Sequence, residues 1–286
     1  MRCAVLGRPV AHSLSPAMHR AAYAELGLEG WTYDAVEVGD DGLPDFLAGL
    51  DGSWRGLSLT MPLKRRAVPL VDSLDDWASV SGAVNTVLLT ERRRLGFNTD
   101  VPGAMAAILE QVHEPIRDVV VVGGGATATS TLLAAVELGC TRARLLVRDP
   151  ARAEETVRQV RAHRRAPSVS VDVLDAAVAA GDVRADLLVS TVPVSAQTPA
   201  LLAAAAAVPA VFDVVYDPWP TPLCLAAQES GRRCVTGLDL LAQQAVLQLQ
   251  VMAGQSVSAG VLRAAALREL RSRGSVDRAS DGVALT

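Results

Sequence analysis

The chain has 286 residues, of which 50% are hydrophobic and 20% charged, with a net charge of −4. This length can bury two cores, so two domains are expected, and the slightly acidic balance disfavours a nucleic-acid partner, which would call for a strong basic excess. No secretory signal is recognisable and no apolar stretch reaches the ~20 residues that a membrane span needs, so we expect a cytoplasmic protein. We also expect a monomer or a homodimer.

The first hundred residues alternate between strand and helix patterns. Short apolar runs predict strands at 3–6, 33–38, 56–60, 84–89 and 95–97. Apolar residues spaced three to four apart predict helices over 16–26 and 43–50. Ser15 is expected to cap the first of these helices, with Pro16 at its first helical position.

The second half alternates more regularly. A connecting helix over 102–112 leads to a buried strand at 118–125 that ends in glycines, and further strands are expected at 143–148, 169–173, 186–191 and 210–216, with helices between them. This alternation predicts a doubly wound parallel sheet, so the fold class is α/β with two α/β domains.

After Gly237 the alternation stops. Two consecutive helices, 238–254 and 258–274, are expected to pack back on the first domain, and residues 275–286 are expected to be disordered. The predicted substrate domain is therefore 1–101 plus 239–274, and the predicted cofactor domain, of the Rossmann type, is 102–238.

Lysine is almost absent from the chain. Lys and Arg total 27, and the only lysine among them is Lys64; the only asparagines are Asn85 and Asn98. In a chain with so few Lys and Asn residues, each residue of these two types that is retained is a candidate for a functional role. Arginine keeps its proton at working pH, whereas lysine can exchange one, so Lys64 is a candidate acid–base group.

Cysteine and histidine do not predict a metal site. The four Cys are scattered without a C-x-x-C pair, and each lies in an apolar segment, so buried free thiols are expected. The four His show no ligand spacing with Cys or carboxylates, so no metal is expected.

A glycine-rich segment follows the predicted strand at 118–125. The residues Gly123, Gly124, Gly125, Ala126, Thr127 and Ala128 fit the pattern G-x-G-x-x-A. In such a loop the first glycine permits a tight turn, the second lets the backbone approach a pyrophosphate, and the last small residue allows close helix packing. The segment therefore predicts a dinucleotide site.

The end of the next strand indicates which dinucleotide is bound. An acidic side chain there usually accepts from the ribose 2′-OH of NAD, but here the strand ends in Arg148, with Arg152 one turn further on. Two guanidinium groups suit a 2′-phosphate and favour NADP. Asp149 lies between them and leaves NAD open as an alternative.

Six segments together resemble the shikimate dehydrogenase family in order and spacing. They are 7–16, 58–64, 82–86, 96–100, 213–223 and 237–245, and the resemblance extends over essentially residues 3–270. It implies reversible NADPH-dependent reduction of 3-dehydroshikimate to shikimate, a step of aromatic amino-acid biosynthesis. Both asparagines and the only lysine fall inside these segments.

The resemblance also implies a role for individual residues. It implies that Ser13 and Ser15 bind the substrate carboxylate, and that the hydroxylated ring is bound by Thr60, Asn85, Thr99, Tyr216 and Gln244. It makes Lys64 and Asp100 the catalytic pair. It implies that NADP is held by Gly123, Gly124, Gly125, Ala126, Thr127, Arg148 and Arg152, with Val214 and Gly237 near the nicotinamide.

The chemistry calls for the same residue types. Reduction of a ketone by hydride builds negative charge on its oxygen, which a cationic Lys64 can stabilise and protonate, while Asp100 can fix the geometry of the lysine. Hydroxyl and amide side chains suit a polyhydroxylated acid. His12 and His19 are interpreted as packing or capping residues rather than acid–base groups.

The chain departs from the family pattern at several places. Arg20 replaces the usual Asn, Ala126 replaces a loop glycine, Thr129 replaces the usual Arg of the following helix, and Asp149 lies in the 2′-phosphate segment. Most of these changes are on the cofactor side. An NAD-linked quinate/shikimate dehydrogenase stays open as an alternative. A non-catalytic NADP-binding regulator would be expected to lack the Lys64–Asp100 pair, and a folate-linked methylene dehydrogenase would not explain the Ser-Leu-Ser-Pro segment at 13–16.

Overall fold

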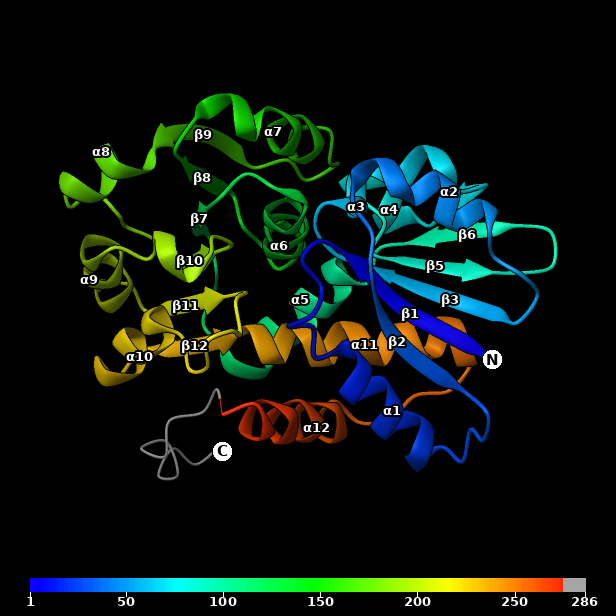
Figure 1. Ribbon diagram of the computed structural model, residues 1–286. Coiled ribbons are helices and arrows are strands. Elements are labelled where there is room, and N and C mark those ends of the chain that lie inside the picture. Colours follow the sequence, from blue (N-terminus) through cyan, green and yellow to red (C-terminus); the bar gives the residue numbers. More distant parts are fainter. Residues whose placement is uncertain (275–286) are drawn as a thin grey trace.

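The computed structural model describes residues 1–274, arranged around two six-stranded sheets (Figure 1). The tail predicted over 275–286 lies outside the described residues. Among the residues that are described, no helix is long and apolar enough to cross a membrane. The α/β class expected from the sequence is confirmed.

The first sheet is mixed, with strand order β2-β1-β3-β5-β6-β4. Its strands are β1 (Arg2–Gly7), β2 (Thr32–Glu37), β3 (Trp54–Leu59), β4 (Ser73–Leu74), β5 (Thr86–Leu89) and β6 (Arg94–Phe97). β1 pairs in parallel with β2 and β3, whereas β5 runs antiparallel to β3 and β6. The helical segments of this part are α1 (Ser15–Glu25), η1 (Asp40–Gly42), α2 (Leu43–Ala48), α3 (Leu63–Arg66), η2 (Val68–Leu70) and α4 (Asp76–Ser81).

The second sheet is parallel throughout, with strand order β12-β11-β10-β7-β8-β9. Its strands are β7 (Asp118–Val122), β8 (Arg142–Val147), β9 (Ser168–Val173), β10 (Leu187–Ser190), β11 (Ala210–Asp213) and β12 (Arg233–Thr236). Its connections are α6 (Ala126–Glu137), η3 (Pro150–Ala153), α7 (Glu154–Arg161), α8 (Leu174–Ala179), η4 (Val194–Ala196), α9 (Pro199–Ala207) and α10 (Pro222–Glu229). The chain leaves β7 toward β8 on one side and reaches β10 on the other, so the strand order reverses at the end of β7, where open α/β sheets bind ligands.

Both faces of the second sheet are buried. Along β7, Val119 and Val121 join a core with α5 (Asp100–Gln111) and α6, whereas Val120 and Val122 join a core with α8, α9 and α10. Since successive side chains of a strand point to opposite faces, the run of four valines fills both cores at once. This is the doubly wound arrangement expected from the alternating pattern.

Two C-terminal helices return to the first sheet, as predicted. In α11 (Gly237–Ala253), Leu238, Ala242 and Leu249 lie in one core with Cys3 and Met18, and α12 (Ala259–Ser272) packs against α1 and α11. Figure 1 shows α11 running beneath both sheets, with α12 beside α1. The long helix thereby places one end near each sheet.

Several predicted boundaries were wrong. Ser15 is the first residue of α1, Leu14 occupies the N-cap, and no side chain caps the helix. The connecting helix α5 begins at Asp100, two residues before the predicted start. β12 was not predicted, and Cys234 within it is half-buried rather than buried like the other three thiols.

Candidate active site

A cavity of about 150 Å³ lies between the end of β3 and the N-terminus of α6. This is below the ~300 Å³ at which sites for drug-sized ligands begin, so the cavity suits a compact metabolite. The sequence-predicted residues that line it are Ser13, Ser15, Thr60, Lys64, Asn85, Asp100, Thr127, Val214, Tyr216, Gly237 and Gln244. Thr99 does not line the cavity but accepts a hydrogen bond from Asn85, which does. The other sequence-predicted residues lie outside this cavity: Gly123, Gly124, Gly125, Ala126, Arg148 and Arg152.

Lys64 and Asp100 form an ion pair at the cavity wall. Lys64 Nζ lies 2.7 Å from Asp100 Oδ2, and the two side chains are 14% and 7% exposed. Lys64 is in α3, which follows β3, and Asp100 is the first residue of α5. Lys64 Nζ also lies 3.5 Å from Thr127 Oγ1 in α6, so the ammonium is at the junction between the two sheets.

The two asparagines orient Asp100. Asn85 Nδ2 donates to Asp100 Oδ1 at 2.8 Å and to Thr99 Oγ1 at 2.9 Å. Asn98 Oδ1 accepts from the backbone N–H of Asp100 and of Val101, which satisfies two donors at the start of α5. Asn85 Oδ1 also accepts from the Thr99 backbone N–H at 2.8 Å, and Asn98 Nδ2 donates to Ser81 Oγ at 2.8 Å. Each asparagine therefore donates and accepts at once, a combination that an ionised Asp cannot supply, and this explains why both are retained in an asparagine-poor chain.

Ser13 and Ser15 line the same cavity as the ion pair, and Ser13 is within hydrogen-bonding reach of Tyr216. Ser13 Oγ accepts from the Ser15 backbone N–H at 3.3 Å. Burial raises the pKa of Tyr216 to about 12, and hydrogen bonding to Ser13 opposes that rise. The phenol therefore stays protonated at neutral pH and joins the two serines as a hydroxyl donor.

A polar layer beneath the cavity was missed at the sequence level. Gln248 Oε1 accepts from Ser58 Oγ at 3.0 Å and lies 3.2 Å from His19 Nε2, while Gln248 Nε2 donates to Thr86 at 2.9 Å. Gln248 lines the cavity together with Gln244, four residues earlier in α11. The i, i+4 spacing of these two glutamines could have identified it.

His19 is a packing residue in this structure. Its ring stacks on Tyr33 with centroids 4.0 Å apart, and burial lowers the pKa of His19 to about 4. The imidazole is therefore neutral at ordinary pH, in keeping with the sequence interpretation. His12 lies at the cavity rim near Tyr216.

The glycine loop has the shape that a pyrophosphate needs. Gly123 has a φ of 118°, and a Cβ there would lie 2.1 Å from Thr191 Oγ1. A Cβ on Gly124 would lie 2.7 Å from the Arg152 carbonyl oxygen, whereas one on Gly125 would meet nothing within 4 Å. The space in front of Gly125 is therefore clear at the N-terminus of α6, where backbone N–H groups favour an anion.

The corner beyond β8 presents two free guanidinium groups. Arg148 and Arg152 are exposed, and neither takes part in an ion pair among residues 1–274. Asp149, which left NAD open at the sequence level, accepts from the Ala151 backbone N–H at 3.1 Å and caps η3. Its carboxylate is thus used to hold the backbone, which favours a 2′-phosphate over a 2′-hydroxyl at this corner.

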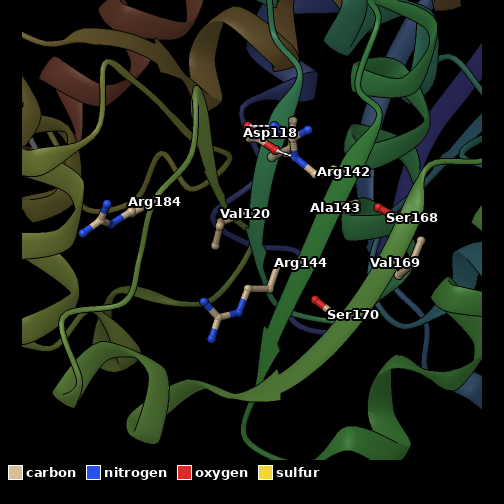
Figure 2. Close-up of a pocket in the computed structure, with 10 residues that line it drawn as sticks. Asp118, Val120, Arg142, Ala143, Arg144, Ser168, Val169, Ser170 and Arg184 are labelled. Atoms are coloured by element: carbon tan, nitrogen blue, oxygen red, sulfur yellow. Dashed lines mark hydrogen bonds and ion pairs between the residues drawn. The ribbon is translucent and has the colours of Figure 1, made fainter.

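A second depression lies at the amino ends of β7, β8 and β9, away from the glycine loop. Figure 2 shows Arg142 against Asp118, with Arg144 and Arg184 further along the groove. Arg144 pairs with Asp172 at 2.7 Å and Asp182 at 3.0 Å. Arg142 and Arg144 are thus paired with carboxylates, and the groove is at the amino ends of the parallel strands rather than at the carboxyl ends where such sheets bind ligands, so it is not the active site. Over the described part of the chain, no cluster of three or more His, Cys, Asp or Glu has a metal-binding arrangement.

Comparison with known proteins links this geometry to one family. A family model described as the shikimate dehydrogenase substrate binding domain matches residues 5–87. A shikimate dehydrogenase (NADP(+)) of Thermus thermophilus is 36% identical over 276 residues, covering 94% of this chain and 99% of that one. The crystal structure of the Mycobacterium tuberculosis shikimate dehydrogenase has a TM-score of 0.80 at 34% identity, and the match covers 92% of this chain and 99% of that one. A Thermus thermophilus shikimate 5-dehydrogenase in complex with NADP(H) and shikimate has a TM-score of 0.80 at 33% identity, and the match covers 94% of this chain and 99% of that one.

Proposed function

The chain belongs to the shikimate dehydrogenase family, and we propose that it catalyses the reversible NADPH-dependent reduction of 3-dehydroshikimate to shikimate in aromatic amino-acid biosynthesis. The observation that carries this proposal is the Lys64–Asp100 ion pair in a small, hydroxyl-lined cavity beside the glycine loop. A regulator that binds NADP without turnover would have no use for such a pair.

The residues of the chain divide the chemistry between them. NADPH, when bound, supplies the hydride. Lys64 donates a hydrogen bond from Nζ to the substrate ketone oxygen, stabilises the charge that develops there and delivers the proton. Asp100 holds the ammonium in place through Oδ2. In the reverse direction Lys64 accepts the hydroxyl proton.

The substrate carboxylate is assigned to Ser13 and Ser15, whose side chains line the cavity. Both hydroxyl groups can donate to a carboxylate oxygen. The hydroxyl groups of the ring are assigned to five residues whose neutral side chains can both donate and accept: Thr60, Asn85, Thr99, Tyr216 and Gln244. A site built in this way discriminates against analogues that lack a matching hydroxyl, because its own buried polar groups would then be unpaired.

Replacing both serines should affect substrate binding selectively. In the Ser13→Ala/Ser15→Ala enzyme we expect KM for shikimate to rise about 100-fold or more, since each of the two lost hydrogen bonds to a charged group contributes roughly 1.5–3 kcal/mol. KM for NADP should change far less. Initial-rate kinetics with each substrate varied in turn measure both constants. An unchanged KM for shikimate would remove the serines from the carboxylate site.

The cofactor preference is assigned to Arg148 and Arg152. We expect the Arg148→Ala/Arg152→Ala enzyme to lose affinity for NADP by about 10- to 100-fold, the size expected for lost charge-assisted hydrogen bonds, while affinity for NAD stays nearly constant. The measurement is kcat/KM for each cofactor at saturating shikimate. Equal losses for the two cofactors would show that these arginines do not bind the 2′-phosphate.

One assay tests the proposed activity and its nearest alternative together. Oxidation of shikimate and of quinate is followed by absorbance, each with NADP and with NAD. We expect shikimate with NADP to give the highest kcat/KM. Comparable rates with quinate and NAD would identify a quinate/shikimate dehydrogenase, and no turnover in any combination would favour the regulator. Activity with a folate-linked substrate would favour the third alternative.

The remaining assignments complete the proposal. We assign residues 1–101 and 239–274 to the substrate domain and 102–238 to the cofactor domain, in line with the two sheets. We further expect the protein to be cytoplasmic and to be a monomer or a homodimer.

A further inference from the structure

We propose that Arg65 is a positioning residue that holds the glycine loop in register with Lys64. It does so by donating hydrogen bonds from α3, beside the first sheet, to two threonines that in turn hold carbonyl groups of the loop beside the second sheet. This inference rests on the proposed NADP-dependent reaction and adds to it a residue that none of the sequence motifs indicates.

Arg65 crosses from one sheet to the other. Its Nη2 lies 3.2 Å from Thr129 Oγ1 in α6 and 3.1 Å from Thr156 Oγ1 in α7. Both threonines are fully buried, and their hydroxyl oxygens are 2.8 Å apart. The guanidinium therefore ends against two hydroxyls that have no access to solvent.

The direction of the hydrogen bonds follows from the donor. A guanidinium only donates, so both hydroxyls accept from Arg65 and must direct their own hydrogens elsewhere. Thr156 Oγ1 donates to the Gly124 carbonyl oxygen at 2.9 Å, and Thr129 Oγ1 lies 3.2 Å from the Gly125 carbonyl oxygen. Arg65 thus begins a chain of donors that fixes the carbonyl side of the glycine loop and leaves its N–H side to the pyrophosphate.

The arrangement is not one that stability alone would select. Arg65 Nε is buried without a partner, and burial together with the nearby Arg158 lowers the pKa of Arg65. An unpaired buried N–H on a partly desolvated cation costs free energy. Buried polar groups left in this state in native proteins call for an explanation, and a functional contact across the two sheets supplies one.

Adjacent residues of α3 reach the same helix at two points. Lys64 Nζ lies 3.5 Å from Thr127 Oγ1, and Arg65 Nη2 lies 3.2 Å from Thr129 Oγ1 two residues further along α6. The position of the catalytic ammonium is therefore tied to the position of the loop. Because a misplacement of about 1 Å can lower a rate by about 10²-fold, this tie matters for the reaction.

The test is Arg65→Met, which keeps an unbranched stem out to the position of Nε and removes all the donors of the side chain. We expect Kd for NADP, measured by fluorescence titration of the enzyme alone, to rise about 10-fold, the size of one lost charge-assisted hydrogen bond. kcat should fall by a similar factor, while KM for shikimate stays within about twofold, because the carboxylate and hydroxyl contacts are elsewhere. A general loss of structure would instead change both substrates together.

Arg66→Met is the matched control. Arg66 is the next residue, its side chain is 57% exposed, and its ion-pair partners are Asp40 and Asp41 rather than groups near the glycine loop. Its replacement should leave both binding constants and kcat near wild type. Thr156→Val removes the next donor of the chain, and the double variant Arg65→Met/Thr156→Val should bind NADP no more weakly than the weaker single variant.

The outcomes separate the inference from the proposed function. Wild-type enzyme that does not bind NADP overturns the proposed function. Wild-type binding that is unchanged within twofold in Arg65→Met, or effects of Arg65→Met and Thr156→Val that multiply in the double variant, overturn the inference alone. Should Arg65→Met fail to fold, unchanged NADP binding in Thr156→Val overturns the inference by itself.

Discussion

The Lys64→Arg enzyme is expected to lose kcat by about 10²–10⁴-fold, the usual range for a missing acid–base group, with Kd for NADP near wild type. Arginine keeps the positive charge and much of the length, so a purely electrostatic role would survive this change. A guanidinium, however, stays protonated and cannot exchange a proton with the substrate oxygen. The measurement is kcat with shikimate at saturating NADP, beside direct titration of the cofactor.

Two controls separate proton transfer from the shape of the side chain. The guanidinium is broader than the ammonium that lies 2.7 Å from Asp100, so Lys64→Ala serves as the reference for complete loss. Adding a small primary amine to the Lys64→Ala enzyme should restore part of the rate, whereas guanidine should not. A Lys64→Arg enzyme within a few-fold of wild-type kcat would leave Lys64 as a binding residue only.

The elements of the fold could be predicted from the sequence wherever their signal lies within a few neighbouring residues. Four consecutive valines followed by glycines identify β7 and the loop, because a strand buried on both faces reads as a continuous apolar run. The return of α11 and α12 to the first sheet followed from the end of the strand–helix alternation. The boundary at Ser15 failed because a serine before a proline is an ordinary helix start, whereas here its hydroxyl lies at the cavity.

The strand β12 was missed because its signal is weak. Only Val235 of its four residues is fully buried, so the segment has neither a continuous apolar run nor a clear alternation of apolar and polar residues. Its place in the sheet is set by pairing with β11 rather than by its own composition. Context of this kind is tertiary, and a single sequence does not contain it.

In the candidate site, too, residues with a local sequence signal could be predicted, whereas contacts made only in the folded chain could not. Its motif residues could be chosen from the sequence because the chemistry calls for a lysine, a carboxylate and neutral hydroxyls at defined spacing. The contacts of Arg65 with Thr129 and Thr156 could not, since they join residues that are 64 and 91 positions apart through two different helices. Asp149 shows a further limit: its residue type left NAD open, and only its bond to Ala151 N–H indicates what the carboxylate does.

The Asp100→Asn enzyme is expected to lose kcat by a factor similar to that of Lys64→Arg, about 10²–10⁴. The carboxylate accepts from Lys64 Nζ through Oδ2 and from Asn85 Nδ2 at 2.8 Å through Oδ1. An amide in its place has one oxygen and one NH₂ group, so whichever way it turns, a donor faces a donor. Either the ammonium or Asn85 then loses its partner, and the lysine is no longer held.

Because we propose that Lys64 and Asp100 act as one unit, we expect that their losses do not multiply. We expect the double variant Lys64→Ala/Asp100→Asn to have about the kcat of the poorer single variant, as groups that cooperate in one step show strong non-additivity. Single-turnover rates at saturating NADPH and 3-dehydroshikimate measure this for the chemical step alone. Losses that multiply across the two sites would mean that Asp100 serves the reaction without Lys64, for instance by binding a ring hydroxyl, and the ion pair at 2.7 Å would then be a structural feature rather than the catalytic unit.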